Sequence, residues 1–269
     1  MLRKGENMQK KNINLDKFKI KVHEGSSIKK VIAVMSGKGG VGKSSVSALL
    51  ANSLNKKGYK VAVFDADITG PSMAEAFGID EAVRGTKEGL MYPAISRDGI
   101  KLISVNMILR EKTDPVIWRS SIVTNVLKQF YTDVDWGEID YMIVDMPPGT
   151  ADVPLTVFQS LPIDGVVAVA TPQGLVEMVV EKSIKMAKMM GKNIIGLVEN
   201  MSYFKCPDCG REYPVFGESR LEEVAAEYGV DVLGRLPIDP KLAAACDKGM
   251  IELFEGDWLD GAADKIEKL

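Results

Sequence analysis

Cysteine and histidine are scarce in this chain of 269 residues, which has three cysteines and one histidine. So few cysteines exclude a scaffold stapled by disulfides. No apolar run approaches the ~18 residues that cross a membrane, and no apolar segment follows the basic N-terminus as it would in a secretory signal. We therefore expect no membrane association. Because thiols stay free in reducing compartments, we also expect a cytoplasmic location.

A broad basic surface is also missing. Residues 1–30 contain nine lysines or arginines and three acids, a net charge of +6, whereas the whole chain has a net charge of −3. The rest of the chain therefore carries −9, which is a poor match to nucleic acid, and we expect no nucleic-acid partner. The first residues also lack hydrophobic periodicity. We interpret residues 1–27 as a basic, flexible extension and residues 28–269 as one domain.

A phosphate-binding loop is the clearest motif in the chain. Residues 37–44 match the pattern G-x-x-x-x-G-K-S, between an apolar strand pattern at 31–35 and a helical pattern at 44–54. Strand, glycine loop and helix are the context that this motif requires. The pattern predicts that Lys43 contacts the nucleotide phosphates and that Ser44 ligates Mg²⁺.

Acidic residues follow two further apolar strands. The segment 60–64 leads into Asp65-Ala-Asp67, and the segment 141–144 leads into Asp145. Near-continuous apolar strands favour a doubly wound, mostly parallel α/β sheet flanked by helices, whose ligands bind at the carboxyl ends of the strands. We expect Asp145 to hold Mg²⁺ and Asp67 to orient the attacking water. For either aspartate, the alternative is a helix N-cap.

The alternation of strands and helices continues to the C-terminus. The expected elements are strand 165–170, helix 175–190, strand 194–198, helix 219–228, strand 231–234 and a C-terminal helix. Asn200 follows strand 194–198 at the ligand edge, where an asparagine is either a ligand or a turn former.

Two of the three cysteines form half of a metal site. Cys206-Pro-Asp-Cys209-Gly is a metal knuckle, but a zinc site or a four-iron cluster needs four ligands. A twofold axis between two copies would supply the other two. Zinc and an exposed redox pair are the alternatives, although Pro207 favours a loop over the helix that redox pairs open. We interpret Cys246, among apolar neighbours, as a packing residue.

These motifs together resemble the Mrp/ApbC family of iron–sulfur cluster carriers, within the P-loop ATPases whose loop has a deviant Walker A pattern. The stretches that match are 37–44, 65–72, 145–152, 198–202, 206–209 and 234–239. The resemblance implies a homodimer that sandwiches two ATP molecules, with Lys38 reaching the nucleotide of the partner. It also implies that Asn200 binds adenine and that Pro237 borders the base. The residues expected to surround ATP in the loop are Gly37, Lys38, Gly39, Gly40, Val41, Gly42, Lys43, Ser44 and Ser45.

The resemblance implies an ATPase that carries a bridging [4Fe–4S] cluster on Cys206 and Cys209 and transfers it to apo-proteins. The alternative is a septum-positioning or plasmid-partitioning ATPase. Such proteins need a basic tail or face, whereas residues 257–269 contain four acids and two lysines. An electron donor similar to nitrogenase iron protein is a weaker alternative, because the cluster cysteines of that donor are far apart in sequence.

Overall fold

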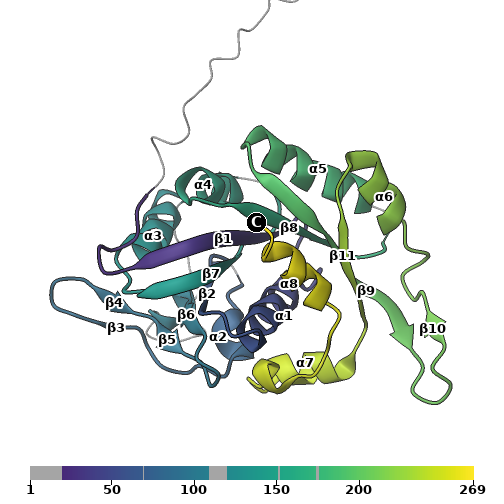
Figure 1. Cartoon of the computed structure of the whole chain (residues 1–269), viewed down its shortest axis with the longest axis horizontal. Helices are drawn as coiled ribbons and strands as arrows, with labels where there is room; N and C mark the ends of the chain where they lie inside the picture. Colours follow the sequence, from purple (N-terminus) through teal and green to yellow (C-terminus); the bar gives the residue numbers. More distant parts are fainter. Residues whose placement is uncertain (1–19, 69, 109–119, 151, 174–175) are drawn as a thin grey trace, which may run out of the picture.

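A sheet of nine strands with helices on both faces forms the body of the protein (Figure 1). The structure is a computed structural model and describes residues 20–68, 70–108, 120–150, 152–173 and 176–269. The strands are β1 (Ser27–Ser36), β2 (Val61–Asp65), β3 (Arg84–Gly85), β4 (Met91–Tyr92), β5 (Ala94–Ile95), β6 (Lys101–Ile103), β7 (Glu138–Asp145), β8 (Gly165–Ala170), β9 (Asn193–Lys205), β10 (Glu212–Tyr213) and β11 (Val232–Pro237). The α-helices are α1 (Lys43–Lys56), α2 (Met73–Ala76), α3 (Ser120–Thr132), α4 (Asp152–Ser160), α5 (Val176–Met189), α6 (Leu221–Tyr228), α7 (Pro240–Asp247) and α8 (Asp260–Ile266).

The strand order places the ends of the central strands side by side. The order is β10-β9-β8-β1-β7-β2-β6-β5, with β11 also paired to β9. Strand β1 lies between β7 and β8 and is parallel to both, while β5 and β10 are antiparallel to their neighbours. The carboxyl ends of β1, β2, β7, β8 and β9 therefore meet at one edge, as in other doubly wound sheets. The fold class expected from the sequence is confirmed.

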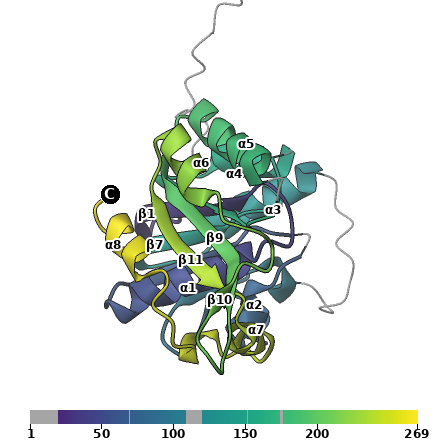
Figure 2. The ribbon, with the colours of Figure 1, turned by 90° about the vertical axis from the view of Figure 1, so that its right-hand side faces the viewer.

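Helices cover both faces of the sheet (Figure 2), and alternate residues of β1 face opposite layers. In β1, Val31 and Ala33 pack in the layer that contains α3, α4, α5 and α6, whereas Ile32 and Val34 pack in the layer that contains α1, α2, α7 and α8. Both faces of the sheet are thus buried, which explains why its strands are almost continuously apolar. Each fully buried aliphatic side chain contributes roughly 1.5–3 kcal/mol.

The C-terminal part differs from the single helix expected from the sequence. It contains two helices, α7 and α8, and the short 3-10 helix η3 (Ile251–Leu253) between them. Gly249, with φ 66°, turns the chain after α7, and a Cβ there would lie 2.4 Å from the Cα of Gly78. This close approach between two backbones follows the end of α7, and helical periodicity alone does not predict it.

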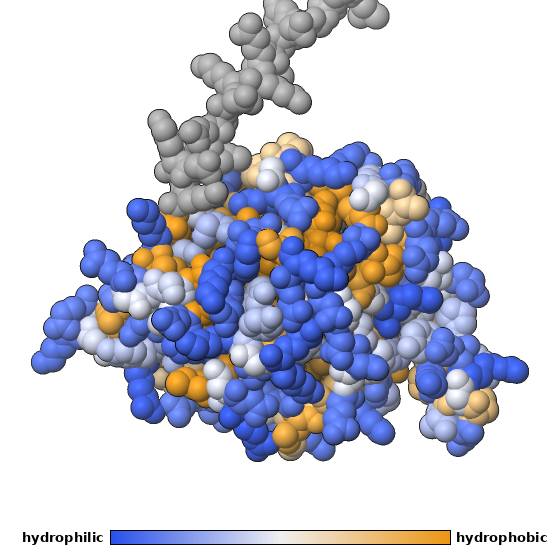
Figure 3. Space-filling model, in the orientation of Figure 1, coloured by the Kyte–Doolittle hydropathy of each residue, from blue (hydrophilic) through white to orange (hydrophobic). Residues whose placement is uncertain are grey.

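The hairpin of β9 and β10 extends beyond the body of the sheet (Figures 1 and 2). Tyr213, Val215 and Phe216, which are on or just after β10, have exposed fractions of 43%, 57% and 37%. Most of the face shown in Figure 3 is hydrophilic. Within the part of the chain that the structure describes, no helix is both long and apolar enough to cross a membrane.

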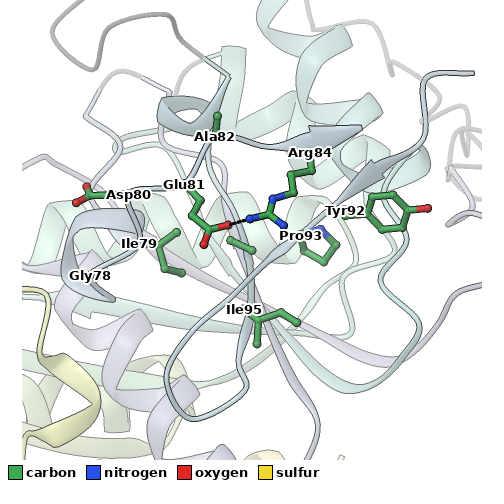
Figure 4. Close-up of a pocket in the computed structure, with 10 residues that line it drawn as sticks. Gly78, Ile79, Asp80, Glu81, Ala82, Arg84, Tyr92, Pro93 and Ile95 are labelled. Carbon is green, nitrogen blue, oxygen red and sulfur yellow. Dashed lines mark hydrogen bonds and ion pairs between the residues drawn. The ribbon is translucent and has the colours of Figure 1, made fainter. Parts of the chain in front are cut away.

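An open cleft of about 530 Å³ lies at the opposite side of the sheet, between the segment after α2 and the strands β3 to β5 (Figure 4). The ion pair of Glu81 with Arg84, at 2.7 Å, is part of its wall. None of the residues in the phosphate-binding loop lines this cleft.

The N-terminal segment reaches the body before β1 begins. Ile20 and Val22 pack against the helical layer of α3 to α6, and the backbone N–H of Ile20 donates to the carbonyl of Ser160 at 3.2 Å. The rest of the expected extension, residues 1–19, lies outside the described residues.

Candidate functional site: a phosphate-binding loop linked to a cysteine hairpin

The phosphate-binding loop connects β1 to α1. Gly40 and Gly42 both have φ 76°, a conformation that glycine adopts at little cost. Gly42 is also the residue before α1, and no side chain caps this helix N-terminus. The first N–H groups of a helix have no partners within the helix and attract anions. The loop therefore offers backbone donors and a helix N-terminus to a phosphate group.

A side chain from β9 closes the space above Gly42. A Cβ at this position would lie 2.0 Å from Nδ2 of Asn200. That Nδ2 donates to the backbone carbonyl of Val41 at 2.9 Å, and Asn200 is buried. Glycine is thus required at position 42 for conformation and for space. Asn200 lies against the loop, at the edge where the sequence places it.

Lys43 is held by two carboxylates. Its Nζ lies 2.7 Å from Oδ2 of Asp145 and 3.6 Å from Oδ2 of Asp67, and the side chain is only 6% exposed. The structure therefore brings the three residues together from α1, β7 and the loop after β2. An anionic phosphate in the loop would offer the ammonium group a competing partner.

The residues expected to ligate Mg²⁺ are adjacent. Ser44 Oγ donates to Oδ2 of Asp145 at 2.7 Å, and Ser47 Oγ donates to the other carboxylate oxygen at 2.6 Å. A hydroxyl and a carboxylate oxygen are hard ligands of the kind that Mg²⁺ prefers, so the residues present fit this ion. Ser47 was not among the expected site residues. Its position four residues after Lys43, on the same face of a helix, is the signal that could have indicated it.

Asp65 organises the loop that carries Asp67. Its carboxylate accepts hydrogen bonds from the backbone N–H groups of Asp67 and Met73, at 3.1 and 3.2 Å, and from Ser104 Oγ at 2.9 Å. Complete burial, followed by repulsion from the neighbouring Asp145, raises the pKa of Asp65 to about 7. The role of Asp65 is not evident from its sequence position, because its burial and its partners depend on the tertiary fold.

Lys38 and the end of β8 lie on the accessible side of the loop. The Nζ of Lys38 donates to Oε1 of Gln173 at 2.9 Å. Thr171, also after β8, is buried, and its hydroxyl has no hydrogen-bond partner among the described residues. Buried hydroxyls without partners are uncommon, so Thr171 marks a polar position at the ligand edge.

Of the remaining expected nucleotide residues, Ser45 is on α1 and Pro237 is on β11. Ser45 Oγ lies 3.9 Å from Sγ of Cys246, which is half-buried on α7. Pro237 ends β11 and is paired with Tyr203 of β9. Burial raises the pKa of the Cys246 thiol, in keeping with its interpretation as a packing residue.

Cys206 and Cys209 are in the turn between β9 and β10. The backbone N–H of Cys206 donates to the carbonyl of Arg211, and the N–H of Gly210 donates to the carbonyl of Cys206, both at 2.9 Å. Cys209 is exposed, and Cys206 is half-buried. Backbone N–H groups of Cys209 and Asp208, and then the Cys209 thiol, lower the pKa of Cys206, which favours the thiolate that binds metals.

The hairpin alone does not complete a metal site. Among the described residues, no group of three or more His, Cys, Asp or Glu side chains is placed to hold a metal ion. One chain therefore presents two thiols in one turn, which are too few for a four-thiolate centre.

Comparison with known proteins identifies the family. A family model described as "ParA: NUBPL iron-transfer P-loop NTPase" matches residues 27–266. An iron–sulfur cluster carrier protein of Clostridium perfringens is 48% identical over 235 residues, covering 85% of this chain and 82% of the relative. One of Methanocaldococcus jannaschii is 46% identical over 226 residues, covering 84% of this chain and 78% of the relative.

Solved structures agree with this assignment. A nucleotide-binding protein of Archaeoglobus fulgidus in complex with ADP is 43% identical, with a TM-score of 0.78, and the match covers 86% of this chain and 90% of that one. The MinC:MinD cell division complex of Aquifex aeolicus has a TM-score of 0.65 with 19% identity, covering 89% and 96%, and shares the fold. The resemblance inferred from the motifs is confirmed, and the chain belongs to the NUBPL family of iron-transfer P-loop NTPases.

Proposed function

We propose that this protein is a homodimeric ATPase that binds one [4Fe–4S] cluster between its subunits and transfers it to apo-proteins. The observation that carries the proposal is the turn at Cys206 and Cys209, which presents two thiols on a chain with a complete phosphate-binding loop. Two copies related by a twofold axis would contribute four thiolates to one centre. The names of the related proteins support this cargo.

The residues at the sheet edge divide the work of ATP hydrolysis. ATP draws Lys43 from Asp145 to the β- and γ-phosphates. The released carboxylate and the Ser44 hydroxyl would hold Mg²⁺, which would supply positive charge to the phosphates. Asp67 orients a water, whose oxygen attacks the γ-phosphorus while the bond to the β–γ bridging oxygen breaks. ADP leaves, and the proton of the water passes to the released phosphate.

The dimer completes both kinds of site. In this proposal Lys38 leaves Gln173 and reaches the nucleotide of the partner, so that hydrolysis depends on association. Asn200 and Pro237 contact the adenine, and the P-loop residues from Gly37 to Ser45 surround the phosphates. A labile cluster and free thiols suit a reducing compartment, so we place the protein in the cytoplasm.

Iron content per dimer tests the proposal. After anaerobic reconstitution with ferrous iron and sulfide, we expect about four iron atoms per dimer and the broad visible absorption of thiolate-to-iron charge transfer. Cys206→Ala and Cys209→Ala should each lose the cluster and keep ATPase activity, and Cys246→Ala should keep both. About eight irons per dimer, or a stable cluster in a proven monomer, would contradict a shared site. Zinc in place of iron, with no transfer to an apo iron–sulfur protein, would contradict the cargo.

A positioning or partitioning ATPase is the competing function. The MinD fold is shared, but the identity of 19% supports no more than the fold. The same reconstitution separates the two functions, because a positioning ATPase has no reason to bind iron and sulfide stoichiometrically.

A further inference from the structure

Strand β9 connects the phosphate-binding loop to the cysteine turn without a break. Asn200, near its middle, donates to the carbonyl of Val41 in the loop, and its last residue, Lys205, directly precedes Cys206. The strand continues well beyond the edge predicted from the sequence. One short stretch of chain therefore contacts the nucleotide loop through the Asn200 side chain and leads directly into the thiols.

An irregularity in β9 lies between these two points. Glu199 pairs with Arg235 of β11, and Tyr203 pairs with Pro237, so four residue steps on β9 oppose two on β11. Within this bulge Met201 has φ 55°, the one positive φ outside glycine among the described residues. Bulges redirect side chains and backbone, and strained backbone is a common feature of functional segments. This bulge turns Asn200 to the loop and the following residues to the hairpin.

Glu199 ties both ends of the hairpin together at its base. Its carboxylate is fully buried, accepts a hydrogen bond from Ser202 on the outgoing strand and accepts another, at 2.9 Å, from Ser219 on the returning chain. Arg235 Nε donates to Ser202 Oγ at 2.9 Å and lies 3.6 Å from the Glu199 carboxylate. A buried carboxylate with several donors is a rigid point, because the loss of any one of these bonds leaves the buried charge less well compensated.

We propose that Glu199 is a positioning residue that makes the orientation of the Cys206–Cys209 turn depend on the nucleotide in the phosphate-binding loop. A phosphate that shifts the loop shifts the carbonyl of Val41 and with it Asn200. Because Glu199 is adjacent to Asn200 and is hydrogen-bonded to Ser202 and Ser219, a movement of Asn200 carries these two serines and the base of the hairpin with it. The inference rests on the proposed function for its biological meaning and on the contacts above for its mechanism.

Thiol reactivity in the metal-free full-length protein tests this link directly. The rates at which iodoacetamide modifies Cys206 and Cys209 would be measured by peptide mass spectrometry, with and without a non-hydrolysable ATP analogue. In the wild type we expect the analogue to change at least one rate by about fivefold or more, which is the lower range of typical coupling between sites. Affinity for a fluorescent ATP analogue would be measured in the same samples.

Two variants weaken the hydrogen bonds of the Glu199 carboxylate at different points. Ser219→Ala removes one of the two hydroxyl donors, and Glu199→Gln replaces one acceptor oxygen by a donor, facing serines that already accept hydrogen bonds. In both, we expect nucleotide affinity to be retained while the change in thiol reactivity falls to nearly nothing. Ser53→Ala is the matched control, because it removes a serine-to-carboxylate bond of 3.1 Å, to Asp260, far from the hairpin. It should respond as the wild type does.

The outcomes separate this inference from the proposed function. The link would be overturned if the ATP analogue did not change the thiol modification rates of the wild type. It would also be overturned if the analogue changed these rates in Ser219→Ala and Glu199→Gln as much as in the wild type. A full response in these variants would also show that dimerisation merely covers the thiols. If Glu199→Gln does not fold, the half-buried Ser219 supplies the milder variant. Because the assay contains no iron, a protein that binds no cluster could still show the link.

Discussion

Lys43 and Asp145 form a buried ion pair, with Nζ 2.7 Å from Oδ2 and exposed fractions of 6% and 0% for the two side chains. The pair joins the start of α1 to the end of β7 and holds the lysine beside the position expected for phosphate. We expect Lys43→Ala to lower ATP affinity by about one to two orders of magnitude, the range for losing a hydrogen bond to a charged group. Calorimetric titration with ATP measures this, and Lys56→Ala, at the exposed end of the same helix, is the control.

Asp67 is expected to act at a later step than Lys43. Asp67→Ala should leave ATP binding in place and lower the hydrolysis rate by about two to four orders of magnitude, because the water loses the group that orients it. Phosphate release under saturating ATP is the measurement, with Asp98→Ala on an exposed turn as the control. Equal rates in wild type and Asp67→Ala would remove Asp67 from the mechanism.

Lys38 is expected to act in the site of the partner subunit. The Lys38→Ala protein should still bind nucleotide in each subunit. It should lose both hydrolysis and the ATP-dependent tightening of the dimer, because the contact with the nucleotide of the partner is missing. Mixing it with Lys43→Ala produces heterodimers in which one site keeps its own Lys43 and receives an intact Lys38 from the partner. Partial recovery of ATPase activity is the expected result, and verified heterodimers without activity would contradict action across the interface.

The cysteines should differ in their response to pH. Nearby backbone N–H groups lower the pKa of Cys206, whereas burial raises the pKa of Cys246. As pH rises, Cys206 should become reactive to iodoacetamide before Cys246 does, and peptide mass spectrometry can follow both in one sample. The difference should disappear in urea, where both thiols are solvated. Modification of Cys246 at the lower pH would contradict the environments described for both residues.

Asp65 predicts a dependence of stability on pH. Burial and the charge of Asp145 raise its pKa to about 7, so the folded protein keeps this proton while the unfolded chain loses it near pH 4. The side chain therefore lowers the free energy of unfolding progressively as pH rises from about 4 to 7, by at most about 4 kcal/mol, and adds nothing further above that range.

Asp65→Asn removes the titration. Urea unfolding without nucleotide or Mg²⁺, repeated across this pH range, should show the variant gaining stability relative to the wild type as pH rises to 7. Parallel curves for the two proteins would show that Asp65 titrates normally. The lost hydrogen bonds of the 65–73 loop shift the whole curve but do not change its slope.

The features that could be predicted from the sequence are those that depend on local sequence patterns. The loop at 37–44, the apolar strand before it and the aspartates after β2 and β7 depend on short stretches of chain, and they have the expected places. The end of β9 could not be predicted in this way. Residues 199–205 mix polar and apolar side chains, and they form a strand because β11 and β10 supply its partners.

Roles that depend on distant contacts were also missed. Gln173 beside Lys38, and Ser219 beside Glu199, are separated from their partners by 135 and 20 residues. Neither glutamine nor serine has a spacing that indicates such a contact. Asp65 and Asp67 are equivalent in the sequence as acids after a strand, and their different burial and partners distinguish them only in the fold.

The order of strands has a consequence for synthesis on the ribosome. Strand β1 does not pair with β2, which follows it along the chain, because β7 lies between them. A nascent chain that has emerged only through α1 and β2 contains the whole phosphate-binding loop. It does not yet contain β7, which separates β1 from β2, or Asp145 at the end of β7. The sheet edge that receives nucleotide can therefore close only after residue 145 has left the exit tunnel, so nucleotide cannot guide the folding of the first half of this protein.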